Sequence, residues 1–355
     1  MKKILLLCLL VFTLALSACG TQKVADLPSA SPSPDSVATP EPTPEATPTP
    51  EPKKEYLVYE TLDSTAIKAN LVEEKSKRML AICLPPSYYE DTNKRYPVIY
   101  FMHGHGEGVG HVSSKSPTML KLMKEGTLKE VITVEADCGS VLGGSFYANS
   151  PVTGGFEDFY INELVPYIDG KYRTIANSSS RGISGFSMGG FGAMYIGFRH
   201  PDVFSAIYAL GPGLFDPNGV KSAIDKSWDT SFENNYGAVF SPNTTLPFPY
   251  ANIPAFDGSD ADNQIIADWY NGFGNWEQKI IDYKALPVQL KAIKIQYGTN
   301  DNYPFIKDGS EYVAKLLNDA GIVTTLETFA GGHNVSPAFV AKELLPFFEA
   351  NLTME

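Results

Sequence analysis

Residues 185–189 constrain the fold of this chain more than any other segment. They read Gly-Phe-Ser-Met-Gly and match the pattern G-x-S-x-G. The residues before them can end a short strand, and residues 190–200 have a helical pattern rich in small side chains. This order predicts a sharp, strained turn that exposes Ser187 between a strand and a helix, with glycines where a Cβ would clash. A bare match could be a Gly/Ser-rich turn without chemistry, but the flanking elements favour a nucleophile.

The rest of the chain alternates short strand patterns with helical patterns. Residues 97–102 form a continuous apolar run, which is typical of a strand buried on both faces of a parallel sheet. The alternation predicts the α/β class, with a mostly parallel sheet covered by helices on both faces. Strands are expected at residues 78–84, 97–102, 131–136, 181–183, 204–210, 294–297 and 323–329. Helices are expected at residues 117–125, 157–172, 190–200, 309–320 and 337–352.

Residues 214–289 do not follow this alternation. The segment is rich in Pro, Asn, Asp and aromatic residues, and a loop of that length without structure of its own is improbable in a domain. We interpret it as an insertion with a few helices that lies over the carboxyl edge of the sheet. Its aromatic residues could form its own small core, but Trp269 and Trp276 are candidates for a wall of a substrate pocket.

A serine hydroxyl needs a base to act as a nucleophile at neutral pH. Among the five histidines, His333 follows the last expected strand in a Gly-Gly-His-Asn loop. In α/β-hydrolases the acid and then the histidine follow the serine in the sequence, and only His333 suits that order. Asp301 directly follows the strand at 294–297 and is the predicted acid, which would orient His333. Asp308 competes with it but should lie in or just before a helix, and Asp301 could alternatively be a helix-capping turn residue.

The glycine-rich loop after the first core strand, residues 103–108, predicts half of an oxyanion hole. Its glycines allow the backbone to approach a ligand closely. The backbone amide of His105 is the expected first donor, and the amide of Met188, at the start of the helix after Ser187, is the second. His103 is expected to be structural, with hydrogen bonds beneath the loop.

The first 54 residues differ in composition from the rest. Residues 1–18 combine two lysines, an apolar run and small residues, which predicts a signal peptide. Residues 16–19, which end at Cys19, resemble a bacterial lipobox. The resemblance implies cleavage before Cys19 and lipidation of its side chain. An ordinary signal peptide with an incidental cysteine is the alternative. Residues 19–54 are rich in Pro, Thr and Glu and predict an extended linker, and residues 55–355 form the folded domain.

The net charge and the cysteine content limit which ligands, metals and disulfides are expected. The formal net charge is −12, which disfavours nucleic acid as a partner. Cys83 and Cys138 are the only cysteines in the folded domain. Export would allow a disulfide between them, but two small buried thiols are the more natural interpretation. No spacing of Cys and His suggests a metal site, and no cofactor is expected.

The motifs together resemble one family, the α/β-hydrolases of the esterase D group, which includes feruloyl and acetyl xylan esterases. The segments that carry the resemblance are residues 84–88, 103–104, 163–172, 185–190, 298–301 and 332–333. The resemblance covers most of the domain. It implies an α/β-hydrolase fold and a Ser-His-Asp triad, but it does not specify a substrate, since the family also contains S-formylglutathione hydrolases and mycolyltransferases.

The family resemblance implies a serine carboxylic ester hydrolase, and the signal pattern with the linker predicts that it is extracellular and anchored to the membrane. Its expected substrates are feruloyl or acetyl esters on plant cell-wall polysaccharide such as xylan. An acyltransferase, or an esterase for another small or envelope ester, is the alternative enzyme. A non-catalytic surface binding protein on the same scaffold would require a broken triad, and the motif residues of this chain are all present.

Overall fold

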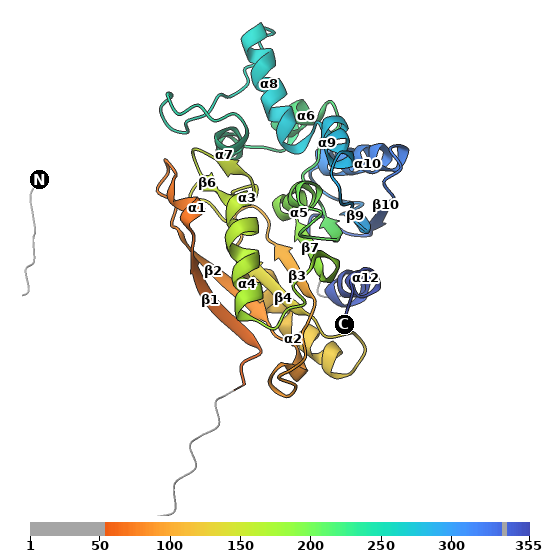
Figure 1. Cartoon of the computed structure of the whole chain (residues 1–355). Helices are drawn as coiled ribbons and strands as arrows, with labels where there is room; N and C mark the ends of the chain where they lie inside the picture. Colours follow the sequence, from red (N-terminus) through yellow and green to blue (C-terminus); the bar gives the residue numbers. More distant parts are fainter. Residues whose placement is uncertain (1–53, 336–338) are drawn as a thin grey trace, which may run out of the picture. The chain divides into compact units, whose positions relative to one another are not determined.

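A computed structural model describes residues 54–335 and 339–355 of the chain (Figure 1). The predicted signal peptide, Cys19 and nearly all of the predicted linker lie outside the described residues. No helix within the described part is long and apolar enough to cross a membrane.

The centre of the fold is an eight-stranded sheet with the order β1-β2-β4-β3-β7-β8-β9-β10. β1 and β2 pair antiparallel, as do β2 and β4, and every other neighbouring pair is parallel. The predicted mostly parallel sheet is therefore confirmed. The strands are β1 (Leu57–Asp63), β2 (Lys77–Cys83), β3 (Val98–Met102), β4 (Ile132–Ala136), β7 (Arg181–Phe186), β8 (Ala206–Leu210), β9 (Ala292–Gly298) and β10 (Thr324–Phe329). A separate hairpin pairs β5 (Asn149–Ser150) with β6 (Gly154–Gly155).

Helices cover both faces of the sheet. One apolar cluster joins one face to α2 (Gly110–Lys124) and to the C-terminal helix, a π-helical turn (Val340–Leu344) that continues into α12 (Leu345–Asn351). A larger cluster joins the other face to three helices. These are α4 (Val165–Lys171), α5 (Met188–Arg199) and α10 (Pro304–Asp319). Shorter elements are α1 (Thr65–Lys68), α3 (Phe156–Asp158), a π-helical turn (Phe159–Leu164) and two 3₁₀ turns (Pro86–Tyr89 and Ser178–Ser180).

Two of the differences from the sequence prediction have a clear physical reason. β1 was not predicted, because it is an edge strand with only one half-buried face and its apolar alternation is weak. The helix expected at 117–125 begins at Gly110, so Pro117 lies inside α2. Proline cannot donate to the carbonyl of Ser113, but the Ser116 hydroxyl donates to that oxygen at 3.0 Å and replaces the missing bond.

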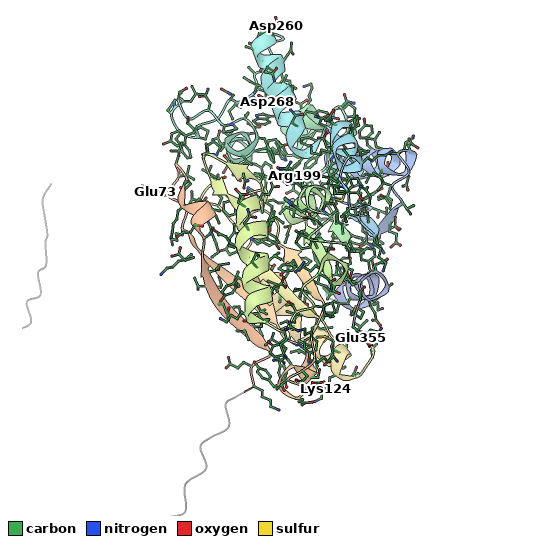
Figure 2. The ribbon with its side chains drawn as sticks, in the orientation of Figure 1. Glu73, Lys124, Arg199, Asp260, Asp268 and Glu355 are labelled. Atoms are coloured by element: carbon green, nitrogen blue, oxygen red, sulfur yellow. The ribbon has the colours of Figure 1, made fainter. Side chains whose placement is uncertain are left out.

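The predicted insertion lies between β8 and β9. It contains α6 (Gly219–Lys226), α7 (Thr230–Phe240), α8 (Asp260–Phe273) and α9 (Trp276–Lys284). Figure 1 shows these helices gathered at one end of the sheet, and Figure 2 places Asp260 and Asp268 on the outward-projecting part of α8. Most aromatic residues of the insertion belong to the same large apolar cluster as α5 and α10. The insertion is therefore packed as part of the main core.

Both cysteines of the folded domain are buried free thiols. Burial raises the pKa of the Cys83 thiol to about 12. This outcome agrees with the interpretation of Cys83 and Cys138 as small core residues rather than as a disulfide.

Candidate active site

Ser187 occupies the turn between β7 and α5. Its backbone has φ 56° and ψ −117°, a conformation that L-residues rarely adopt. A Cβ on Gly185 would lie 2.2 Å from the Gly189 carbonyl oxygen, and one on Gly189 would lie 2.1 Å from the Met102 carbonyl oxygen. The close approach of β7, α5 and β3 thus requires both glycines, and the strained turn presents Ser187 at the carboxyl edge of the sheet.

His333 and Asp301 form a buried pair. His333 Nδ1 lies 2.7 Å from Asp301 Oδ2, and the two side chains are only 12% and 2% exposed. Asp301 follows β9, and its other oxygen accepts the Tyr303 amide at 2.9 Å. The imidazole lies 4.6 Å from the Phe186 ring and 4.9 Å from the Tyr303 ring, measured between centroids. These contacts hold the ring with Nδ1 on the carboxylate and leave Nε2 for a second partner.

His333 meets two criteria together: it lines the same cavity as Ser187, and its imidazole is paired with a carboxylate. Ser187 and His333 both line a cavity of about 430 Å³. His111 and His200 also pair with carboxylates, Glu107 and Glu157, each at 2.8 Å, but neither of these two histidines lines this cavity. Asp308 lies within α10, in agreement with its expected place in or just before a helix, and the carboxylate bonded to His333 is that of Asp301.

His105 and Met188 line the cavity beside Ser187. Within the described residues, neither backbone amide donates to a protein acceptor. The Met188 amide belongs to the first residue of α5, where helix N–H groups point outward and favour negative charge. Two unused donors next to a serine are suited to bind an oxyanion.

His103 lies beneath this loop and is fully buried. Its Nδ1 lies 2.8 Å from the Gly104 carbonyl oxygen, and its Nε2 accepts the Cys138 amide at 2.8 Å. Burial lowers the pKa of His103, so the ring is neutral with the proton on Nδ1. His103 therefore lies beneath the loop with structural hydrogen bonds, as expected from the sequence.

Aromatic side chains are the most numerous group in the cavity wall. Its acidic members are Glu107 and Asp229, and no lysine or arginine is among the lining residues. A hydrogen bond from His111 lowers the pKa of Glu107, so this side chain is an anion at neutral pH. The aromatic lining residues are Phe186, Trp228, Phe232, Phe273, Tyr303 and Phe305. The cavity therefore suits a neutral ligand with an apolar or aromatic part.

The assignment of Trp269 and Trp276 to the pocket wall is wrong. Both are 0% exposed and neither lines the cavity. The Trp269 indole N–H donates to the Ser241 hydroxyl at 2.7 Å, and that of Trp276 to the Phe273 carbonyl at 2.8 Å, so both are core residues. Trp228 lines the cavity instead. It directly precedes the α7 cap Asp229, and nothing in its sequence context separates it from the other two tryptophans.

Comparisons with known proteins agree with this fold. The model of a family described as putative esterase matches residues 73–246. An endo-1,4-beta-xylanase/feruloyl esterase from Xylanibacter ruminicola is 33% identical over 138 residues, which are 36% of this chain and 18% of that protein. Esterase Rv1288 from Mycobacterium tuberculosis is 34% identical over 116 residues, which are 31% of this chain and 24% of that protein. The chain thus spans less than a quarter of the length of these relatives.

Solved structures extend the likeness to nearly the whole folded part. A ferulic acid esterase superposes with a TM-score of 0.60 at 24% identity and covers 83% of this chain and 98% of its own. The S-formylglutathione hydrolase FrmB from Staphylococcus aureus superposes with a TM-score of 0.56 at 15% identity and covers 82% of this chain and 98% of its own. Sheet order, strained serine turn, family match and solved structures together show that the chain has the α/β-hydrolase fold of the esterase type.

Proposed function

We propose that this protein is a serine carboxylic ester hydrolase that removes feruloyl groups, or smaller acyl groups such as acetyl, from plant cell-wall polysaccharide. The observation that carries the proposal is one cavity lined by Ser187 and by a His333 that is paired with Asp301. The feruloyl esterase relatives support the substrate class.

In the proposed reaction the Ser187 hydroxyl oxygen attacks the ester carbonyl while His333 Nε2 takes its proton. Asp301 stabilises the resulting imidazolium, and the amides of His105 and Met188 bind the oxyanion. The tetrahedral intermediate collapses, the sugar oxygen leaves with the proton from His333, and the acyl group stays on Ser187. Water, deprotonated by His333, then attacks the acyl-enzyme and releases the carboxylic acid and free Ser187. These steps require no cofactor.

The cavity lining supports an aromatic acyl group and a neutral substrate. Trp228, Phe232 and Phe273 offer ring faces and edges to a cinnamoyl ring. Glu107 and Asp229 repel anions, and no lining lysine or arginine would pair with the carboxylates of a glutathione thioester. These features favour a feruloyl ester over S-formylglutathione.

The test is a hydrolysis panel on the purified protein with Ser187→Ala as the blank. It compares methyl ferulate, feruloylated arabinoxylan, acetylated xylan, p-nitrophenyl acetate and S-formylglutathione. Release of ferulate well above the blank is expected. Hydrolysis of acetyl esters alone would keep the triad and reject the feruloyl assignment, transfer of the acyl group to an added alcohol would favour an acyltransferase, and unchanged activity of Ser187→Ala would reject the mechanism.

We also propose that the protein is an extracellular lipoprotein held on the bacterial cell membrane through Cys19. The support is the sequence of residues 1–54, in which a signal pattern ends at Cys19 and an extended Pro-rich linker follows. Two or more acyl chains are sufficient for stable anchoring. Cys19→Ala should abolish labelling by a clickable fatty acid and shift the protein out of the membrane fraction. Labelling that persists in the variant would reject the assignment.

A further inference from the structure

Asn235, on α7 of the insertion, is fully buried and makes three hydrogen bonds to segments at the active-site edge. Its Oδ1 accepts the Gly144 amide at 2.8 Å and lies 2.9 Å from His105 Nε2. Its Nδ2 donates to the Gly144 carbonyl oxygen at 2.9 Å. Because a backbone amide only donates and a carbonyl only accepts, the orientation of the Asn235 amide is determined. His105 Nε2 must then carry a proton and donate to Oδ1.

Gly144 is in turn the surface on which the two oxyanion residues pack. A Cβ on Gly144 would lie 2.3 Å from the Met188 sulfur and 2.8 Å from His105 Cδ2. One on Gly143 would lie 2.4 Å from His105 Cε1. The Gly143 carbonyl also accepts the Gly106 amide at 3.0 Å, which ties the same strip of backbone to the loop that carries His105. No larger residue could bring these groups so close.

The His105 ring is held on its other side by the insertion. Its centroid lies 4.6 Å from that of Phe232, which is on α7 one turn before Asn235. Burial lowers the pKa of His105, so the ring is neutral and has a single N–H to donate. Asn235 is the acceptor of that N–H. A residue of the insertion therefore determines where both the side chain and, through it, the backbone of His105 lie.

We propose that Asn235 is the positioning residue of the oxyanion hole. This inference rests on the proposed function, since it takes the His105 and Met188 amides as the oxyanion donors. The Asn235 side chain bonds both the amide and the carbonyl of Gly144, and Gly144 packs against His105 and Met188. The Asn235 side chain also accepts a hydrogen bond directly from the His105 ring. The insertion thus takes part in the chemistry through this one side chain, in addition to forming the pocket wall.

The test is Asn235→Leu in the full chain, assayed with methyl ferulate and p-nitrophenyl acetate. Leucine has the same branched shape and number of side-chain heavy atoms, and it removes all three hydrogen bonds. Because oxyanion donors act mainly in the transition state, kcat should fall about 10- to 100-fold while KM changes less than about 3-fold. The affinity for a trifluoromethyl ketone, whose serine adduct places an oxyanion in the hole, should fall by a factor similar to that of kcat/KM. The affinity for the product ferulate should stay within about 3-fold.

Tyr236→Phe is the matched control. Tyr236 is the next residue of α7, is fully buried, and its hydroxyl bonds the Trp269 carbonyl at 2.9 Å and the Phe273 amide at 2.8 Å, both within the insertion. The Tyr236→Phe substitution removes these two bonds and so loosens the insertion without changing the bonds of His105 or Gly144. It should lower the melting temperature but keep kcat within about 2-fold. His105→Phe, which keeps the Asn235–Gly144 bonds and removes only the ring bond, should fold even if Asn235→Leu does not and should lower kcat about 3- to 30-fold.

The outcomes separate this inference from the proposed function. An active wild-type enzyme together with an unchanged kcat in Asn235→Leu would overturn the role of Asn235 and leave the proposed esterase function intact. If Asn235→Leu fails to fold, an unchanged kcat in His105→Phe would have the same meaning. Equal losses of kcat in Tyr236→Phe and Asn235→Leu would also overturn it, because general loosening would then explain the effect. A wild-type protein that hydrolyses no ester would overturn the proposed function and this inference with it.

Discussion

At the scale of the residue, the surroundings of three histidines distinguish their roles. His103 has both ring nitrogens on backbone groups, and His105 donates to a side-chain amide. His333 has its Nδ1 on the buried Asp301 and faces the serine cavity. Only an imidazole with a carboxylate behind it is stabilised as it takes a proton, so the partner atoms, and not the residue type, identify the candidate base.

Asp301→Asn should lower kcat for ester hydrolysis about 10³- to 10⁴-fold. Asparagine can present an N–H to His333 Nδ1 and so favours the tautomer in which Nε2 carries the proton and cannot act as a base. KM should change little, and steady-state kinetics with p-nitrophenyl acetate measures both. The control is Asp308→Asn, which lies in α10 and should keep kcat within about 2-fold. Equal losses in the two variants would reject Asp301 as the acid.

Glu135 allows a prediction on pH. It is fully buried in β4, its Oε2 accepts the Val112 amide at 2.9 Å, and burial raises the pKa of its carboxyl to about 8. The unfolded chain ionises this group near pH 4.3, so between about pH 4.5 and 8 the folded state binds more protons and stability falls as pH rises.

Glu135→Gln removes this dependence. Its stability relative to the wild type should therefore grow by about 1 kcal/mol per pH unit between pH 5 and 8, measured by urea unfolding. Glu125→Gln, at the exposed end of α2, serves as the reference and should show no such trend. A constant difference between Glu135→Gln and wild type across this range would mean that Glu135 is ionised in the folded protein.

At the scale of the element, side chains cap both ends of α8 and the start of α7. Asp229 is the N-cap of α7 and accepts the Phe232 amide at 2.9 Å, and Ser259 is the N-cap of α8 and accepts the Asp262 amide at 3.2 Å. At the other end of α8, Lys279 Nζ donates to the carbonyls of Asn271 at 2.7 Å and Gly272 at 3.2 Å, and also to that of Gly274. Burial lowers the pKa of Lys279 to about 7, and its Nζ group meets the orphan carbonyls at the negative end of the helix.

Lys279→Met should destabilise the protein by about 2 kcal/mol, because it leaves these carbonyls without a donor in a partly buried place. Chemical denaturation with unchanged m-value is the measurement. The comparison is Lys284→Met, whose Nζ makes one exposed bond to the Ala320 carbonyl at 3.0 Å and should cost less than about 0.5 kcal/mol. Equal effects of the two substitutions would contradict the capping role.

At the scale of the whole molecule, the cavity forms where the insertion meets the carboxyl edge of the sheet. Its wall combines loops after β3 and β10 with α7, α8 and α10, which are far apart in the sequence. The insertion packs into the same apolar cluster as α5 and α10, so its contribution to the wall is part of the core of the protein. Substrate selectivity should therefore depend on residues of the insertion that touch the cavity and not on those that only fill the core.

Trp228→Ala tests this selectivity. It should lower kcat/KM for methyl ferulate about 10-fold or more, because a ring face is lost from the acyl pocket, and should change p-nitrophenyl acetate hydrolysis less than about 3-fold. The measurement is the ratio of the two kcat/KM values. Trp276→Phe, which changes a buried tryptophan outside the cavity, should leave the ratio unchanged. A Trp228→Ala ratio equal to that of the wild type would place the acyl group elsewhere.

The features that could be predicted from the sequence are those that depend on local chemistry. The serine turn can be predicted because its strained backbone requires glycines at fixed positions relative to the serine. β3 can be predicted because a strand that is buried on both faces is continuously apolar. Asp301 could be predicted as the acid because it follows a strand and lies between Ser187 and His333, in the order that the fold requires. The α/β class followed from the same alternation of elements.

Which insertion residues reach the cavity depends on long-range packing and becomes visible in the folded structure. Trp228, Trp269 and Trp276 are the same residue type in similar aromatic surroundings, and their roles depend on which side of α7, α8 and α9 packs toward the sheet. The same holds for Asn235, an ordinary helical asparagine until folding places His105 and Gly144 against it. Burial and partnership are properties of contacts between distant segments, and local sequence patterns do not encode those contacts.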